Sequence, residues 1–242
     1  PTGSGKSTSS YASLKVIKSE GTNITTVEDP VDYQMDGLNQ VQTHDSIGLS
    51  FSASLRSILR QDPDILLIGE IRDEETADIA VKFSLTGHLV FSTVHANDAA
   101  STITRLLDIG VKPFLVGSCL NLVMAQRLVR TICKNCKESY TPTKEELEMV
   151  GLDKSMLNSN EIFRGKGCSH CRNTGYHGRT GIFELIPMSR EIRGLVYENA
   201  NEDEIRQKAM DEGMANLRDS GIRKILAGDT SISEILRSTV TD

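Results

Sequence analysis

A glycine-rich run at Thr2–Ser7 limits the possible folds of this chain more than any other feature of its sequence. Its last three residues, Gly5, Lys6 and Ser7, match the end of the Walker A pattern G-x-x-x-x-G-K-[ST]. Glycines are needed there because backbone N–H groups must wrap closely around phosphate oxygens. We expect Lys6 to reach the β- and γ-phosphates of a nucleotide and Ser7 to ligate Mg²⁺. The residues expected to line this phosphate site are Thr2, Gly3, Ser4, Gly5, Lys6, Ser7 and Thr8.

The segment after the glycine-rich run has the pattern of a helix. Tyr11, Leu14 and Ile17 recur at helical spacing over Ser7–Lys18, and such a helix directs its positive end at a bound phosphate. A flexible Gly/Ser-rich terminus is the alternative interpretation, but it does not explain an amphipathic helix at this point. The first glycine of the Walker A pattern would precede Pro1, so we expect the chain to be a fragment of a longer protein.

Strand and helix patterns alternate along residues 1–130. Ile65–Ile68 is a continuous apolar run, as in a strand of a sheet that is buried on both faces. Such alternation predicts a parallel sheet with helices on both of its faces. The other expected strands are Ile24–Val27 and Leu89–Val94, the second also of the buried type. The expected helices are Ser52–Gln61, Glu74–Leu85, Asp98–Leu107 and Pro113–Ile132.

Acidic residues follow two of the expected strands. The strand Ile65–Ile68 runs into Gly69 and Glu70, which puts Glu70 in the position of a Walker B acid that organises Mg²⁺ and water. Glu28 and Asp32 follow the first strand and are candidates to orient the attacking water. We expect Glu70 to emerge beside the phosphate loop, at the carboxyl edge of the sheet. An exposed acid in a loop and an Asp-Pro turn are the alternative interpretations.

Three basic side chains complete the expected nucleotide site. His88 and His95 bracket the strand Leu89–Val94, and either could donate a hydrogen bond to a γ-phosphate. A histidine at the end of a strand is equally consistent with a structural role. Arg72 follows Glu70 closely in the sequence, and we assign it, with the two histidines, to the nucleotide-binding residues.

Four of the five cysteines form two C-x-x-C pairs, Cys133/Cys136 and Cys168/Cys171. Two such pairs supply four thiolates, which suit tetrahedral zinc at about 2.3 Å per bond. Because protein ligands fill all four positions, we expect a structural zinc site rather than a catalytic one. His170, inside the second pair, is a reserve ligand. A nucleic-acid-binding zinc ribbon is the alternative; nearby lysines and arginines favour it and nearby glutamates oppose it.

The changes of pattern along the chain predict three parts. Residues 1–130 are expected to form the nucleotide-binding sheet domain, and residues 131–182 a small zinc-binding subdomain held by the four cysteines. Residues 183–242 are expected to form a helical C-terminal subdomain, with Ser231 as the N-cap of its last helix.

The composition limits the possible partners. The formal net charge is −6 and the chain has no tryptophan, so a general attraction to nucleic acid or to anionic lipid is not expected. No apolar run reaches the length needed to span a membrane. We therefore look for function in the phosphate site and in the cysteine pairs.

The motifs together resemble one family. The runs PTGSGKST, VEDPVDYQ, RQDPDILLIGEIRD and LTGHLVFSTVHAND are similar to those of the type II/type IV secretion ATPase superfamily. The cysteine pairs and the run MAQRLVRTICKNCKE narrow the resemblance to its assembly branch, the GspE/PilB-like motors. The resemblance covers essentially the whole chain, and it implies that the chain is the C-terminal, RecA-like ATPase region of such a motor.

The resemblance also implies a role for particular residues. Glu70 takes the place of the family's unusual glycine-glutamate Walker B, and His88 and His95 take the place of its His box. The run Glu28–Asp32 takes the place of its Asp box, whose last acid polarises the attacking water. That acid is usually glutamate in the family, whereas here it is the shorter Asp32, which makes Glu28 the substitute candidate.

As a motor of this kind, the protein would hydrolyse ATP with Mg²⁺ and would carry one structural Zn²⁺. The resemblance implies a homo-hexamer that drives pseudopilus or type IV pilus assembly. It also implies a cytoplasmic location on the inner face of the membrane, against inner-membrane platform and recruiting proteins, with no direct nucleic-acid partner. Three alternatives stay open at this point: a nucleotide-binding regulatory module with little turnover, a pilus retraction motor, and a nucleic-acid translocase.

Overall fold

The computed structural model describes residues 2–153, 157 and 161–239, and the chain divides into two compact units. The sheet unit consists of Lys6–Val123 and Pro187–Ala209. The cysteine unit consists of the described residues of Pro1–Gly5, Met124–Ile186 and Met210–Asp242. Both units are discontinuous in sequence, so their boundaries differ from those of the three contiguous parts expected above, and that division into domains stays a prediction.

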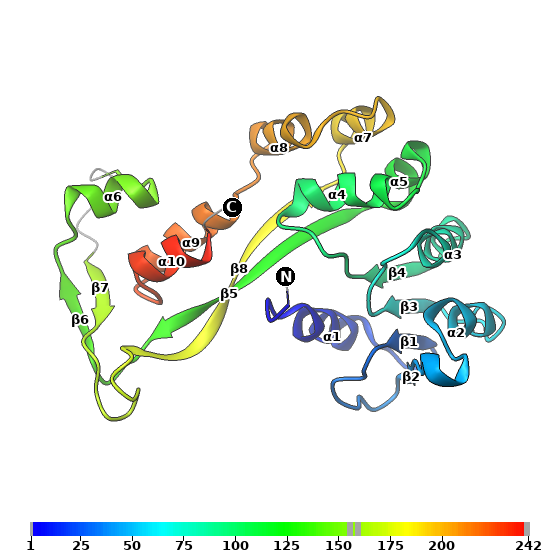
Figure 1. Ribbon diagram of the computed structural model, residues 1–242, viewed down its shortest axis with the longest axis horizontal. Helices are drawn as coiled ribbons and strands as arrows, with labels where there is room; N and C mark the ends of the chain where they lie inside the picture. Colours follow the sequence, from blue (N-terminus) through cyan, green and yellow to red (C-terminus); the bar gives the residue numbers. More distant parts are fainter. Residues whose placement is uncertain (1, 154–156, 158–160, 240–242) are drawn as a thin grey trace. The chain divides into compact units, whose positions relative to one another are not determined.

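The sheet unit is built on a four-stranded parallel sheet with the strand order β2-β1-β3-β4 (Figure 1). Ile24 of β1 pairs with Ile65 of β3, which in turn pairs with Leu89 of β4. The two central strands are buried along their whole length, as expected for a parallel sheet with both faces covered. The strands are β1 (Ile24–Glu28), β2 (Asn39–Gln42), β3 (Ile65–Ile68) and β4 (Leu89–Ser92).

Helices cover both faces of this sheet, which confirms the α/β architecture predicted from the alternating pattern. Helix α1 lies on one face and α2 and α3 lie on the other (Figure 1). Tyr11 and Leu14 of α1 pack on Ile24, Ile65 and Leu67 to form a buried cluster. The helices of this unit are α1 (Lys6–Ile17), α2 (Phe51–Ile58), α3 (Glu74–Leu85), α4 (Ala99–Asp108), α5 (Pro113–Cys119), α7 (Arg190–Tyr197) and α8 (Glu202–Asp211, whose last residues lie in the cysteine unit), with a short 3-10 helix η1 (Asp45–Ile47).

Two expectations about secondary structure are wrong. The helix expected over Pro113–Ile132 ends at Cys119, and β5 (Leu122–Ile132) replaces the rest of it. Leu120 has an extended backbone, and the residues after it form a strand that pairs with β8. The run beginning at Leu89 was expected to be buried, but β4 is an edge strand of the sheet and Leu89 is 42% exposed.

Among the described residues, the cysteine unit contains two pairs of strands, and helices pack beside them. Strands β6 (Lys137–Tyr140) and β7 (Ile162–Gly165) pair antiparallel, while β5 pairs with β8 (Tyr176–Pro187). Val129, Ile182, Ile225 and Ile235 belong to its buried cluster. The helices are α6 (Lys144–Val150), α9 (Leu217–Leu226) and α10 (Ile232–Ser238). Among the described residues, no helix is both long enough and apolar enough to cross a membrane.

Candidate nucleotide and metal sites

The glycine-rich run forms a turn that leads directly into α1 at Lys6. Gly3 and Gly5 have φ angles of 77° and 91°, in the left-handed region that favours glycine. The side-chain amide of Gln126 donates to the carbonyl oxygen of Ser4 at 2.8 Å, and a Cβ on Gly5 would lie 2.6 Å from that same amide nitrogen. The conformation of this turn therefore needs the glycines that the Walker A pattern supplies.

The start of α1 is suited to an anion. Its first turn contains no acidic residue, so no carboxylate of that turn offsets the positive end of the helix dipole. Ser7 and Thr8, in that turn, are exposed, as are Thr2 and Gly3 in the loop before it. The hydroxyls of Ser7 and Thr8 are thus accessible at a helix N-terminus, whereas Lys6 is half-buried and Ser4 is buried.

Glu70, Arg72 and His95 meet just beyond the carboxyl ends of β3 and β4. Arg72 forms an ion pair with one carboxylate oxygen of Glu70, and the Nε2 atom of His95 lies 3.0 Å from the other. The side chain of Glu70 is only 13% exposed, whereas those of Arg72 and His95 are mostly exposed. The structure therefore brings together three of the residues that were assigned to the site, Glu70 and Arg72 from one motif and His95 from another.

Backbone contacts between β1, β3 and β4 hold this group in place. The N–H of Gly69 donates to the carbonyl oxygen of Val27 at 2.7 Å, and the Thr93 hydroxyl donates to the carbonyl oxygen of Gly69 at 2.7 Å. A Cβ on Gly69 would lie 3.2 Å from the Cα of Glu28, so a glycine at this position allows the two strand ends to approach closely. The close approach explains why Glu70 follows a glycine.

The electrostatics of the group favour an ionised Glu70. Burial opposes the charged form, but the hydrogen bonds and charges of Arg72 and His95 outweigh it and lower the pKa of Glu70. The hydrogen bond that Arg72 donates to Glu70 in turn raises the pKa of Arg72, and the charges of Asp29 and Asp45 add to that effect. A carboxylate held in its charged form at this edge can bind a cation or accept a proton from water.

Glu28 and Asp32 occupy different environments. The carboxylate of Glu28 is 5% exposed and accepts hydrogen bonds from the hydroxyls of Tyr11 and Thr26. Asp32 lies in the loop between β1 and β2, and its side chain is exposed. The geometry therefore favours Asp32 over Glu28 as the acid that faces solvent and substrate, and the roles of both residues stay predictions.

The two histidines lie at opposite ends of β4. His88 precedes the strand, and its ring stacks on Phe83 with centroids 4.2 Å apart while its Nδ1 lies 2.9 Å from the Thr86 hydroxyl oxygen. His95 follows the strand and contacts Glu70. The nucleotide-binding role predicted for His88 stays a prediction, and its surroundings favour the structural alternative.

The four cysteines of the two C-x-x-C pairs come together in the cysteine unit, as the sequence predicts, and their sulfur atoms all lie within 4.8 Å of one another. The antiparallel pairing of β6 with β7 explains this, because it puts Lys137 opposite Gly165 and thus sets the two pairs side by side. Sulfur–sulfur distances of 3.7 to 3.9 Å join Cys133 to Cys168, Cys136 to Cys171 and Cys168 to Cys171. A tetrahedral ion at about 2.3 Å from each sulfur requires edges of about 3.8 Å, so this set fits zinc.

Backbone N–H groups point at the sulfur atoms. Cys171 accepts from the N–H of Cys168 and of Gly175, each at 3.2 Å, and Cys136 accepts from the N–H of Gly167 at 3.3 Å. Burial opposes the thiolate of Cys171, but these two hydrogen bonds and its sulfur neighbours lower its pKa to about 6. Such donors stabilise thiolate, the form of cysteine that binds metal. The ring of the reserve ligand, His170, instead lies against the ring of His177 in a tilted arrangement, with centroids 4.5 Å apart.

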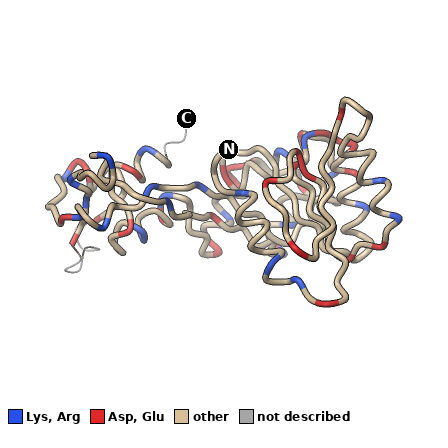
Figure 2. Tube along the Cα trace, turned by 90° about the horizontal axis from the view of Figure 1, so that it is seen from below, with Lys and Arg blue, Asp and Glu red and all other residues tan. Residues whose placement is uncertain are grey.

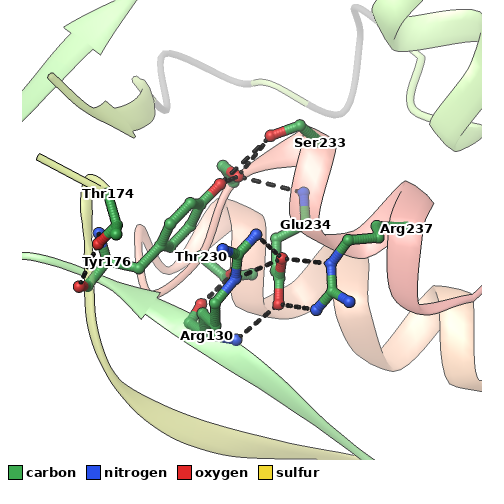
Figure 3. A network of polar contacts seen from close by, with 8 residues as sticks. Arg130, Thr174, Tyr176, Thr230, Ser233, Glu234 and Arg237 are labelled. Atoms are coloured by element: carbon green, nitrogen blue, oxygen red, sulfur yellow. Dashed lines mark hydrogen bonds and ion pairs between the residues drawn. The ribbon is translucent and has the colours of Figure 1, made fainter. Parts of the chain in front are cut away.

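A network in the cysteine unit was not predicted from the sequence (Figure 3). The carboxylate of Glu234, which is fully buried, accepts from the guanidinium groups of Arg130 and Arg237 and from the Arg130 backbone N–H at 2.6 to 3.0 Å. The Arg130 guanidinium also lies 4.1 Å from the ring centre of Tyr176, whose hydroxyl contacts the α10 N-cap Ser231 at 2.5 Å. No local pattern indicates this arrangement, because its members come from β5, β8 and α10.

Comparison with known proteins identifies the family. Residues 1–237 match the family described as type II/IV secretion system protein. The chain is 47% identical to the type IV pilus assembly ATPase PilB of Myxococcus xanthus, over 100% of this chain and 43% of that protein. It is 46% identical to the type II secretion system protein E of Pseudomonas aeruginosa, over 99% of this chain and 47% of that protein.

A solved structure extends the comparison to the fold. The pilus retraction motor PilT, determined with bound ADP, superposes with a TM-score of 0.70 at 26% identity, covering 98% of this chain and 58% of that one. The chain spans less than half the length of the two sequence relatives. Because the family match extends over nearly all of its residues, the chain belongs to the type II/IV secretion system protein family.

Proposed function

We propose that the protein containing this chain hydrolyses ATP with Mg²⁺ and uses the energy to assemble a type II secretion pseudopilus or a type IV pilus. The observation that carries the proposal is the group of Glu70, Arg72 and His95 at the carboxyl edge of the parallel sheet, where nucleotide sites of such sheets lie. The names of the relatives supply the process, since they are pilus assembly and type II secretion ATPases.

The proposed roles follow from charge and position. Lys6 and the N–H groups at the start of α1 would bind the β- and γ-phosphates, and the Ser7 hydroxyl, with Glu70, would hold Mg²⁺. Asp32 orients the water that attacks the γ-phosphate and accepts its proton, while the phosphoanhydride bond breaks and ADP leaves. Arg72 and His95 keep Glu70 ionised and contact the γ-phosphate. When bound, Mg²⁺ neutralises the charge that develops on the phosphate oxygens.

The four cysteines support a structural zinc site. All four coordination positions would be filled by Cys133, Cys136, Cys168 and Cys171, which leaves none for a substrate. The ion would join the β5–β6 turn to the β7–β8 turn and so stabilise the cysteine unit. We also propose that the full-length protein works as a homo-hexamer on the inner face of the bacterial cytoplasmic membrane, in contact with the platform and recruiting proteins of the machine.

Phosphate release from ATP by the full-length protein tests the proposal. We expect Mg²⁺-dependent turnover. Lys6→Ala and Glu70→Ala should each reduce it at least 100-fold, because each variant removes a charged side chain that is proposed to act at the reacting phosphates. Two matched variants, Lys82→Ala and Glu75→Ala, remove exposed charges that form surface ion pairs, and they are expected to leave turnover unchanged. Wild-type rates in Lys6→Ala or Glu70→Ala would refute the proposed mechanism.

One observation favours a second function, a nucleotide-binding module with little turnover. Asp32 is shorter by one methylene than the glutamate that the family resemblance leads one to expect at this position. Tight ATP binding without phosphate release above background would establish that function.

For a nucleic-acid translocase the support is weaker, because Figure 2 shows Lys and Arg interspersed with Asp and Glu in both units along the described residues. DNA binding that weakens steeply with salt would revive it.

A further inference from the structure

The loop that carries Asp32 is held by side chains of the neighbouring strand. We call residues 29–38, between β1 and β2, the Asp32 loop. The side-chain oxygen of Gln42 accepts from the Val31 N–H at 3.2 Å, and that of Gln40 accepts from the Met35 N–H at 2.7 Å. The Gln40 amide also donates to the carbonyl oxygen of Tyr33 at 3.2 Å. The loop backbone is therefore fixed on both sides of Asp32.

A third contact comes from α1 and reaches Asp32 itself. The hydroxyl of Tyr11 donates a hydrogen bond to the carboxylate of Glu28, and its oxygen interacts with the backbone N–H of Asp32. The Tyr11 ring meets the ring of Tyr33 edge to face, with centroids 4.7 Å apart. Tyr11 is 1% exposed, so its hydroxyl has no access to bulk water as an alternative partner. One buried hydroxyl thus bridges the end of β1 and the Asp32 loop.

Glu28 provides the anchor for this bridge. Its carboxylate accepts from Tyr11 and, at 2.6 Å, from the Thr26 hydroxyl, and the Gln40 amide lies at 3.4 Å. A buried carboxylate is tolerated only when it is hydrogen-bonded, and hydrogen bonds to a charged acceptor are stronger than neutral ones. The hydrogen bond to Glu28 therefore fixes the orientation of the Tyr11 hydroxyl beside the Asp32 backbone.

The position of Tyr11 on α1 connects the Asp32 loop to the helix that begins at the phosphate loop. Tyr11 lies four residues after Ser7, which places it one helical turn further along the face that carries the proposed Mg²⁺ ligand. We infer that Tyr11 is a positioning residue: with Glu28 as its anchor, it sets the Asp32 backbone relative to the helix that binds the phosphates. The inference rests on the proposed ATP hydrolysis at this site. A short aspartate side chain makes backbone placement more important, because small displacements of reacting groups cost large factors in rate.

Steady-state ATP hydrolysis by full-length Tyr11→Phe tests the inference. Phenylalanine keeps the ring packed against Tyr33 and removes only the hydroxyl. We expect kcat to fall about tenfold, the cost of one hydrogen bond that positions a reacting group, while the KM for ATP stays within about twofold. A general loosening of α1 would raise KM instead, because Lys6 and Ser7 lie on the same helix. The matched control, Tyr176→Phe, removes a tyrosine hydroxyl that contacts Ser231 in the cysteine unit and is expected to leave kcat unchanged.

Two variants of Glu28 separate an anchor from a proton acceptor. Glutamine keeps an oxygen that can accept from Tyr11, and its amide can donate to Thr26, whose hydroxyl can also accept. Glu28→Gln is therefore expected to keep kcat within about threefold of wild type, whereas Glu28→Ala is expected to lower it about as much as Tyr11→Phe. A loss of 100-fold or more in Glu28→Gln would show that Glu28 itself accepts the proton and would overturn the inference.

Amide hydrogen exchange provides a readout that is independent of turnover. In Tyr11→Phe we expect the N–H groups of Asp32 and Tyr33 to exchange about tenfold faster, with the exchange of β3 unchanged. Unchanged exchange at Asp32, or a kcat within twofold of wild type in Tyr11→Phe, would overturn the inference. Absence of turnover in the wild-type protein would instead refute the proposed function, and the exchange measurement would still decide whether Tyr11 holds the loop.

Discussion

Replacing Glu234 with glutamine tests whether its carboxylate stabilises the cysteine unit as an ion. Burial opposes the charged form, but the hydrogen bonds from Arg237 and Arg130 outweigh it and lower the pKa of Glu234 from 4.5 to about 2. A difference of about 2.5 pKa units corresponds to about 3 kcal/mol of stability at neutral pH. Glutamine has a similar shape but no charge, and it turns an amide N–H₂ toward an arginine. We therefore expect Glu234→Gln to lower the free energy of unfolding by about 3 kcal/mol at pH 7.

The pH dependence gives this prediction its sign. Because the folded-state pKa lies below the unfolded one, the carboxylate contributes its full stability above about pH 4.5 and loses it as the pH falls toward 2. The difference between wild type and Glu234→Gln should therefore be constant from pH 7 to 5 and should shrink by about 1 kcal/mol by pH 3.5. The glutamine variant lacks this titration, so only the wild type loses stability by this route.

Urea denaturation followed by far-UV circular dichroism measures the difference, since the chain has no tryptophan to report on unfolding by fluorescence. Both proteins are reduced and stripped of metal, so that release of metal on acidification contributes to neither. Glu138→Gln is the matched control: its partner Arg164 lies at 3.0 Å, but the pair is partly exposed and should contribute less than about 1 kcal/mol. A loss in Glu234→Gln that is below 1 kcal/mol, or that does not change between pH 7 and 3.5, would refute the reasoning.

Three further predictions concern the metal site and the packing. The purified protein should contain one zinc per chain by elemental analysis, and Cys171→Ser should lower that content at least tenfold because it removes one of four ligands; full zinc retention would contradict the site. Gly165→Ala should prevent the cysteine unit from folding, since its Cβ would lie 1.9 Å from the carbonyl oxygen of Gly175, and wild-type zinc content in that variant would argue otherwise. Asp98→Ala should destabilise the protein by roughly 1 to 2 kcal/mol in thermal unfolding, because Asp98 caps α4 and also pairs with Arg206 at 2.8 Å; Asp78→Ala, which breaks only an exposed pair, is its control.

Several features of this protein follow from local sequence alone. The helix N-cap at Ser231 and the helix Lys144–Val150 can be predicted because capping is decided within a few residues. The buried strand Ile65–Ile68 can be predicted because an apolar run of that length is typical of a parallel sheet. That the two cysteine pairs lie together can also be predicted, because one tetrahedral ion needs four thiolates.

Other features were decided by contacts between segments that lie far apart in the sequence. The stretch Leu122–Ile132 could not be assigned from its own residues, and it became β5 because β8 offers a pairing edge along its length. Contacts with distant segments also give residues of one motif different environments. Glu28 is buried because Tyr11 and Thr26 satisfy its carboxylate, whereas Asp32, four residues later, faces solvent.

The glycine-rich run and the acids after two strands thus identified the chemistry, because the residue types needed to bind phosphate and Mg²⁺ are few and are spaced by local geometry. Which acid faces solvent and which histidine contacts Glu70 was decided only by the tertiary structure. Strand pairing brought His95 to Glu70 and left His88 beside Phe83, at the other end of β4. Register between strands is a long-range property, so the spacing of residues along one chain does not encode it directly.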